Sequence, residues 1–227
     1  MRDPKPALRA PADPRKPRHF VFALLDNFTL LSFSSAIECL RIANRMAERE
    51  AYSWRLVGEG GETVTSSAGV EFRLDGDLDE LTRDDTLLLC SGIDVQGATT
   101  KRLMGWLRRE ARKGIMVGGL CTAAFSLAKA GLLDGKRATI HWDEMETLAE
   151  RFPEVDVTED RFVIDGDRIS CGGTTTTFEL MLHLIDAHHG AMLRLEVAAL
   201  FMHGEADPRA PTRRGSTIAP GSSTTTS

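Results

Sequence analysis

The sequence contains no apolar run long enough to cross a membrane, and its N-terminus lacks the apolar core of a secretory signal. Cysteine is scarce, and the four cysteines lie far apart in apolar or strand-like runs: Cys39, Cys90, Cys121 and Cys171. Such spacing predicts neither a disulfide framework nor a zinc site. These absences favour a protein of the reducing cytoplasm with no membrane partner.

The sequence also lacks an excess of positive charge. Its 28 Lys and Arg residues are outnumbered by 33 Asp and Glu residues, so the net charge is -5 and the pI is near 5.7. This balance gives no general attraction to nucleic acid. The apolar content of 42% over 227 residues is enough for the core of one α/β domain of ordinary size, with residues to spare.

The two ends of the chain differ in composition from the rest. Residues 1–18 are rich in proline and basic residues and have almost no apolar periodicity, which predicts a disordered leader. Residues 205–227 contain three prolines and finish in a Ser/Thr run, which predicts a disordered tail. We expect the folded domain over residues 19–204.

Strand-like apolar runs alternate with amphipathic helical patterns across this domain. The runs at 19–25 and 86–90 are nearly continuous in apolar residues, as strands buried on both faces should be. Helical stripes follow at 34–49 and 99–112. This alternation predicts an α/β fold with a doubly wound, mainly parallel sheet flanked by helices. Further strands are expected at 52–57, 115–117, 137–141 and within 161–171, and further helices at 144–151, 174–189 and 193–203.

The most informative stretch surrounds Cys121. The apolar run 115–117 meets Gly118 and Gly119 and then the cysteine, and a helical pattern begins at Ala124. This order predicts a strand, a sharp elbow and a helix, with the thiol at the mouth of the sheet beside the positive end of a helix. A thiol in that environment tends to ionise and to face a pocket.

The elbow and its continuation over 130–142 resemble the DJ-1/PfpI superfamily and, more narrowly, the sensor domains of GlxA-type transcriptional regulators of the AraC group. Three other segments agree in order: 34–45 is similar to the first helix of the family, 152–155 follows at the expected place, and 167–174 is similar to the entry into the penultimate helix. The resemblance covers about residues 19–204. It implies the DJ-1/PfpI, flavodoxin-like sandwich, a small-molecule effector and a homodimer.

Within that group the sequence is similar to regulators of glycine betaine, carnitine and related amine catabolism. Such regulators normally carry a second domain of two helix-turn-helix units after the sensor, and residues 205–227 show no such pattern. We therefore expect contact with DNA only through a C-terminal domain that is missing from this chain, as in a truncated or frame-shifted regulator.

The residues alone leave open whether Cys121 performs chemistry or lines a sensor pocket. A nucleophile would need a base within hydrogen-bond reach and an oxyanion site. The backbone N–H of Thr122 and an N–H from the loop at Gly92 and Ile93 are the candidate oxyanion donors.

The resemblance argues against catalysis. Hydrolytic relatives of the PfpI type have histidine where this chain has Thr122, and isocyanide-hydratase-like relatives have aspartate where it has Ser32. Both departures remove the usual proton-transfer partners, so we favour ligand binding without catalysis. The alternative is a stand-alone cysteine-dependent hydrolase or hydratase with Cys121, His141 and Glu38 as catalytic residues.

Four further side chains are candidates for the walls of the ligand site. The resemblance implies that Glu38, on the first helix, hydrogen-bonds the thiol; a surface glutamate is the alternative. His141 is expected on a short strand, either facing the elbow or buried and hydrogen-bonded. Trp142 and Phe33 offer aromatic faces to a quaternary ammonium group, or pack in the core. The predicted ligand site comprises Cys121, Thr122, Glu38, Gly92, Ile93, His141, Trp142 and Phe33.

Two further patterns concern anions and metals. The N–H groups of Gly172–Thr174 begin a helix and would suit a carboxylate, although a tight turn explains them equally well. His188 and His189 are adjacent and point in different directions on a helix, and no histidine–carboxylate set has zinc spacing. We expect no metal and no cofactor.

Overall fold

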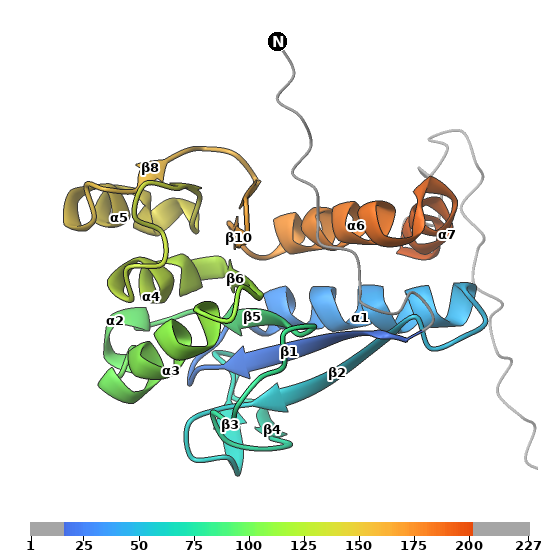
Figure 1. Ribbon diagram of the computed structural model, residues 1–227, viewed down its shortest axis with the longest axis horizontal. Coiled ribbons are helices and arrows are strands. Elements are labelled where there is room, and N and C mark those ends of the chain that lie inside the picture. Colours follow the sequence, from blue (N-terminus) through green and yellow to red (C-terminus); the bar gives the residue numbers. More distant parts are fainter. Residues whose placement is uncertain (1–15, 202–227) are drawn as a thin grey trace, which may run out of the picture.

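A six-stranded sheet forms the centre of the protein, whose computed structural model describes residues 16–201 (Figure 1). The predictions for residues 1–15 and 202–227 lie outside the described residues. Five strands are parallel, and β9 pairs antiparallel with β10 at one edge. In spatial order the strands are β2 (Tyr52–Val57), β1 (Arg18–Leu24), β5 (Thr86–Cys90), β6 (Met116–Leu120), β10 (Arg168–Cys171) and β9 (Phe162–Asp165).

Helices cover both faces of this sheet. The longer helices α1, α6 and α7 pack on one face, and α3 and α4 pack on the other (Figure 1). Two small sheets, β3–β4 and β7–β8, lie outside the central one. The helices are α1 (Leu30–Met46), α2 (Val95–Ala98), α3 (Lys101–Ala111), α4 (Ala124–Lys129), α5 (Met145–Arg151), α6 (Thr175–His189) and α7 (Ala191–Phe201). The remaining short elements are β3 (Thr63–Thr65), β4 (Glu71–Arg73), β7 (Arg137–Ala138), β8 (Asp156–Val157) and the 3-10 turns η1 (Cys121–Ala123) and η2 (Trp142–Glu144).

The alternation of side chains along β1 shows why the sheet needs two helical layers. Phe20 and Phe22 join the cluster that includes α1 and α6, whereas Val21 and Ala23 join the cluster on the opposite face. All four side chains are fully buried. Because both faces of β1 are buried, its sequence is a continuous apolar run. The sheet order and the helices on both faces confirm the predicted doubly wound α/β architecture.

Three elements differ most from the predicted boundaries. Helix α1 begins at Leu30 and not near residue 34, because its apolar stripe starts earlier, with Phe33 already in the core. Strand β6 continues through Gly118 and Gly119, where side chains would collide with neighbours: a Cβ on Gly118 would lie 2.6 Å from Leu88 Cδ2. The expected strand 137–141 is only the two-residue β7.

The strand order fixes where a ligand crevice can form. From β1 the chain crosses to β2 on one side, and it later enters β5 on the other side of β1. The loops that leave the carboxyl ends of β1 and β5 therefore diverge, and crevices at such switch points hold the ligands of open α/β sheets. Within residues 16–201, none of the helices combines the length and apolarity needed to span a bilayer.

Candidate functional site

Cys121 lies at a sharp elbow between β6 and α4. Its φ angle is 62°, in the left-handed region that non-glycine residues rarely occupy. The side chain is only 3% exposed. Gly173 packs directly against it: a Cβ at that position would lie 2.7 Å from Cys121 Cβ and 3.0 Å from Sγ. The predicted elbow is therefore present, and a glycine is needed on its far side.

Hydroxyl and amide groups surround the thiol. Thr29 Oγ1 lies 3.3 Å from Cys121 Sγ, and Ser32 and the backbone N–H of Thr122 also hydrogen-bond the sulfur. Burial raises the pKa of the Cys121 thiol, and these hydrogen bonds offset only part of the rise. The expectation of an ionised thiol is wrong, because the elbow buries the sulfur without providing a positive side chain.

Ser32 links the thiol to the start of α6. Its side chain is 1% exposed, and its Oγ accepts a 2.7 Å hydrogen bond from the backbone N–H of Thr174. The hydroxyl proton is then free to point at Cys121 Sγ. The position at which the resemblance implies an aspartate in isocyanide-hydratase-like relatives is thus beside the thiol, and here it holds a neutral hydroxyl.

The loop after β5 is tied to the elbow by its backbone. Thr122 Oγ1 donates a 2.8 Å hydrogen bond to Gly92 O. The N–H of Ile93 donates to Asn27 O at 3.1 Å, so it is not free to serve as the oxyanion donor considered from the sequence. The Ile93 side chain is 67% exposed. A Cβ on Gly92 would lie 2.4 Å from Asn27 O, which explains the glycine.

Glu38 does not join this group. It lies on α1, and both carboxylate oxygens accept hydrogen bonds from Arg41, the shortest at 2.6 Å. The hydrogen bond from Arg41 lowers the pKa of this carboxyl, which keeps it ionised and paired. The side chain is 43% exposed, as in the surface-glutamate alternative.

His141 and Trp142 reach the elbow through the backbone. The N–H of His141 donates to Cys121 O at 3.2 Å, while ring Nδ1 accepts from the N–H of Asp143 at 3.4 Å. His141 is therefore the cap of η2 and not a strand residue. Trp142 is 76% exposed, with its ring centroid 5.6 Å from that of His141, so it stands at the rim and not in an enclosed wall.

Phe33 belongs to the core. It is 3% exposed, and its ring lies edge-on to Phe22, Phe28 and Phe72 at centroid distances of 5.5–5.6 Å. These contacts are the core-packing alternative for this residue. Phe33 is therefore assigned to the core and not to the ligand site.

The turn before α6 uses its N–H groups internally. Gly172 N–H donates to Arg161 O at 3.1 Å, and Thr174 N–H donates to Ser32 Oγ. The Gly173 N–H hydrogen-bonds the sulfur of Cys171. The carboxylate site considered for 172–174 is therefore wrong for this conformation, and the tight-turn alternative holds.

Thr29 was missed in the sequence. It sits in the loop that leaves β1, beside the switch point, and only the rule that ligands approach the carboxyl ends of parallel strands would have singled it out. Another buried hydroxyl, Ser91 Oγ, follows β5 and has no hydrogen-bond partner within residues 16–201.

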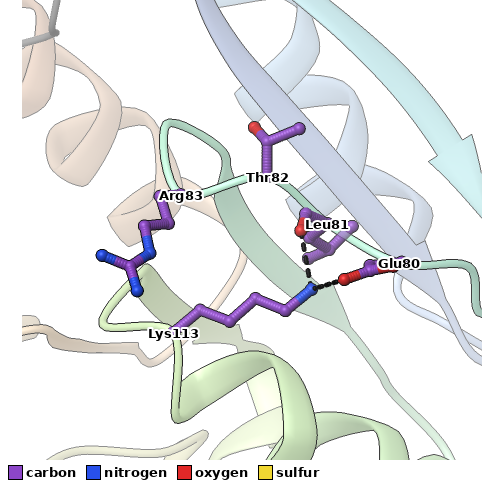
Figure 2. A pocket seen from close by; sticks show the side chains of 5 residues that line it. All are labelled: Glu80, Leu81, Thr82, Arg83 and Lys113. Carbon is purple, nitrogen blue, oxygen red and sulfur yellow. Dashed lines mark hydrogen bonds and ion pairs between the residues drawn. The ribbon is translucent and has the colours of Figure 1, made fainter.

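A separate hollow of about 580 Å³ lies at the amino ends of β5 and β6, at the opposite end of these strands from the elbow. Figure 2 shows Lys113 crossing it to reach the carboxylate of Glu80 and the carbonyl of Leu81, both at 2.8 Å. Lys113 also contacts the fully buried Glu110 at 2.8 Å. These groups satisfy one another and fasten the loop before β5 to the end of α3, and none of the predicted site residues lines the hollow.

Comparison with known proteins gives a consistent family. The model of the DJ-1/PfpI family matches residues 20–187. The HTH-type transcriptional regulator CdhR of Pseudomonas aeruginosa is 40% identical over 190 residues, which are 84% of this chain and 56% of CdhR. The HTH-type transcriptional regulator GlxA of Rhizobium meliloti is 36% identical over 208 residues, 91% of this chain and 64% of GlxA.

A solved structure agrees with these relatives. The crystal structure of an AraC family transcriptional regulator from Pseudomonas putida is 28% identical, with a TM-score of 0.72. The match covers 82% of this chain and 100% of that one. The chain thus spans between about half and two thirds of the length of the curated regulators, but all of the solved regulator chain.

Proposed function

The chain belongs to the DJ-1/PfpI family, and we propose that it is the ligand-sensing part of a transcriptional regulator that binds a small amine-derived metabolite at the Cys121 elbow. Contact with DNA would come from a C-terminal domain of the kind that gives the relatives their HTH-type name. The proposed compartment is the cytoplasm, and the four cysteines are free and buried, which agrees with a reducing environment.

The chemistry around the thiol carries this proposal. A cysteine nucleophile requires a base that removes its proton, and the groups on Cys121 Sγ are two hydroxyls and one amide. The His141 ring caps η2, and Glu38 is paired with Arg41. A neutral thiol among neutral donors can contact a ligand, but it cannot readily attack one.

The exposed aromatic at the rim supports an amine as ligand. Trp142 directly follows His141, whose N–H donates a hydrogen bond to the Cys121 carbonyl, and the Trp142 side chain is exposed to solvent. An ammonium group over such a face gains about 1–2 kcal/mol when it is desolvated. The similarity to regulators of glycine betaine and carnitine catabolism makes these two compounds the first candidates.

A thermal-shift titration with glycine betaine, carnitine and choline tests the proposal. At a ligand concentration of 100 Kd, binding stabilises the folded state by about 2.7 kcal/mol, which raises Tm by roughly 5–10 °C for a domain of this size. At the same ligand concentration Trp142→Ala should remove roughly one third to two thirds of the shift, because it loses the 1–2 kcal/mol or so of the cation–π contact, whereas Cys121→Ser should keep much of it. If no candidate shifts Tm at 10 mM, the amine proposal is refuted.

A stand-alone hydrolase or hydratase is the second candidate, because the strained backbone at Cys121 is also the geometry of a nucleophile elbow. The two candidates separate on turnover. A steady rate of hydrolysis or hydration that is lost in Cys121→Ser would establish the enzyme and contradict the sensor.

We also propose that the protein is a homodimer formed through the last helices. Four apolar side chains of α7 are at least 40% exposed: Met192, Leu195, Leu200 and Phe201. Exposed apolar surface of this kind usually marks a contact with another protein. Light scattering on Leu195→Glu against wild type tests the interface, and an unchanged mass would contradict it.

A further inference from the structure

A cavity of about 310 Å³ lies at the carboxyl ends of β1 and β2, in a place where the sequence predicted no site. Its lining is mixed: polar groups come from Asp26, Glu59, Thr63 and Thr100, and apolar side chains come from Leu24, Leu25, Val64, Leu74 and Ala98. The volume is at the lower end of the range for ligand pockets, which limits an occupant to the size of a small metabolite. The cavity adjoins the switch point, where open α/β sheets bind their ligands.

Two carboxylates are the only charged groups that line the cavity within the described residues. Asp26 is held by the N–H of Thr65, which donates to its Oδ1 at 3.3 Å. Glu59 is held by the hydroxyl of Thr100, which donates to its Oε2 at 2.6 Å. The second oxygen of each carboxylate has no hydrogen-bond partner in residues 16–201, so each can accept a bond from an occupant.

No cationic side chain competes for these oxygens from the lining. Arg102 is close enough to interact with Glu59, but its guanidinium donates to Asp77 Oδ2 at 2.6 Å. The cavity therefore keeps a net negative charge, and because both carboxylates are exposed to solvent, their attraction for a cation weakens as salt is added.

We propose that this cavity binds a small organic cation whose nitrogen carries hydrogens, an ammonium or a guanidinium with a short apolar body. The charged nitrogen donates to the free oxygens of Asp26 and Glu59, and the carbon chain packs on the leucine wall. A quaternary ammonium has no N–H and cannot make these hydrogen bonds. The site is distinct from the elbow and does not depend on the ligand proposed there.

The loop between the two sites gives the occupant a route to the thiol. Asp26 is three residues from Thr29, which lies on Cys121 Sγ. Between them Asn27 holds a left-handed φ of 59°, with its N–H on Thr65 O and its carbonyl on the N–H of Ile93. A cation bound to the Asp26 carboxylate would therefore contact the same short loop that positions Thr29 against the sulfur.

Calorimetric titration of the full chain with butylammonium, butyltrimethylammonium and neutral butanol tests the proposal at pH 7 and low salt. Butylammonium should bind at least tenfold more tightly than either of the other two. Asp26→Asn with Glu59→Gln should weaken its binding at least tenfold. Cys121→Ser and Asp143→Asn, which alter the elbow and its rim, should leave that binding unchanged.

The results that would overturn the cavity proposal differ from those that would overturn ligand binding at the elbow. Equal binding of butylammonium and butyltrimethylammonium would overturn the requirement for N–H groups. Butylammonium binding that survives in the Asp26→Asn, Glu59→Gln variant, or that is absent from wild type, would overturn the site itself. Loss in Cys121→Ser alone would assign the amine to the elbow. Circular dichroism spectra of each variant, matched to wild type, exclude misfolding as the reason for a loss.

Discussion

Replacing Gly173 by alanine tests the packing at the elbow most directly. The new Cβ would lie 2.7 Å from Cys121 Cβ and 2.8 Å from its Cα. Both are contacts with or near backbone, so no flexible side-chain end can swing away. Gly173 also has a φ of +85°, where any L side chain is strained.

Gly190 offers a matched control at nearly the same backbone angle. Its φ is +89°, and a Cβ there would meet nothing within 4 Å. Alanine at Gly190 therefore costs only the backbone strain, about 1–3 kcal/mol. Alanine at Gly173 adds the overlap with Cys121, typically a further 1–3 kcal/mol for an overfilled site.

Urea unfolding followed by circular dichroism measures both losses. We expect Gly173→Ala to lose at least about 1 kcal/mol more free energy of unfolding than Gly190→Ala, the low end of the overpacking cost. Gly173→Ala should also abolish the thermal shift caused by an elbow ligand, which Gly190→Ala should keep. Equal destabilisation by the two variants, within 0.5 kcal/mol or so, would refute the tight contact between Gly173 and the elbow.

Three further predictions concern the core and its charges. Glu110→Ala should cost about 3 kcal/mol in urea unfolding, because it strands the N–H of Leu81 that now donates to the fully buried carboxylate at 3.0 Å. Burial lowers the pKa of His188, on the Tyr52 hydroxyl, to about 3. As pH falls from 7.5 to 5.5, His188 takes up a proton in the unfolded chain but not in the folded protein, so the free energy of unfolding should fall by roughly 1 kcal/mol. His188→Gln should reduce this pH dependence, measured by urea unfolding at each pH. Phe33→Ala should cost about 3–5 kcal/mol as a buried aromatic; a loss below 1 kcal/mol would contradict its place in the core.

Patterns with a strong local cause were readable from the sequence. The apolar run of β1 predicts a strand buried on both faces, and a layer of helices does cover each face of the sheet. The order Gly118, Gly119, Cys121 predicts an elbow because few other arrangements need two glycines before a cysteine. The hairpin within 161–171 and the end of α6 at Gly190 follow from turn chemistry. These elements were predicted and are present.

The site was harder to predict because its contacts join residues far apart in the chain. Thr29 and Cys121 are 92 positions apart, and Ser32 and Thr174 are 142 positions apart. Nothing local in Glu38 distinguishes an acid that reaches the elbow from one that pairs with Arg41 three residues later on the same helix. Side-chain direction decides such cases, and periodicity does not fix it at a helix flank.

The contacts that hold the Cys121 elbow in place involve no charged side chain. The left-handed backbone is maintained by packing and by hydrogen bonds to the backbone: Gly173 lies behind the sulfur, the Thr122 hydroxyl donates to Gly92 O, and the His141 N–H donates to the cysteine carbonyl. The strain is therefore supported by packing around the turn, and the side chains that would move protons can change without loss of the fold. Ser32→Asp would place a carboxylate beside the thiol and remove a hydroxyl that now hydrogen-bonds it, so the thiol pKa should rise, because a negative charge disfavours the thiolate. Alkylation by iodoacetamide across pH 6–10 measures that pKa, and an unchanged profile would contradict the contact between residue 32 and the sulfur.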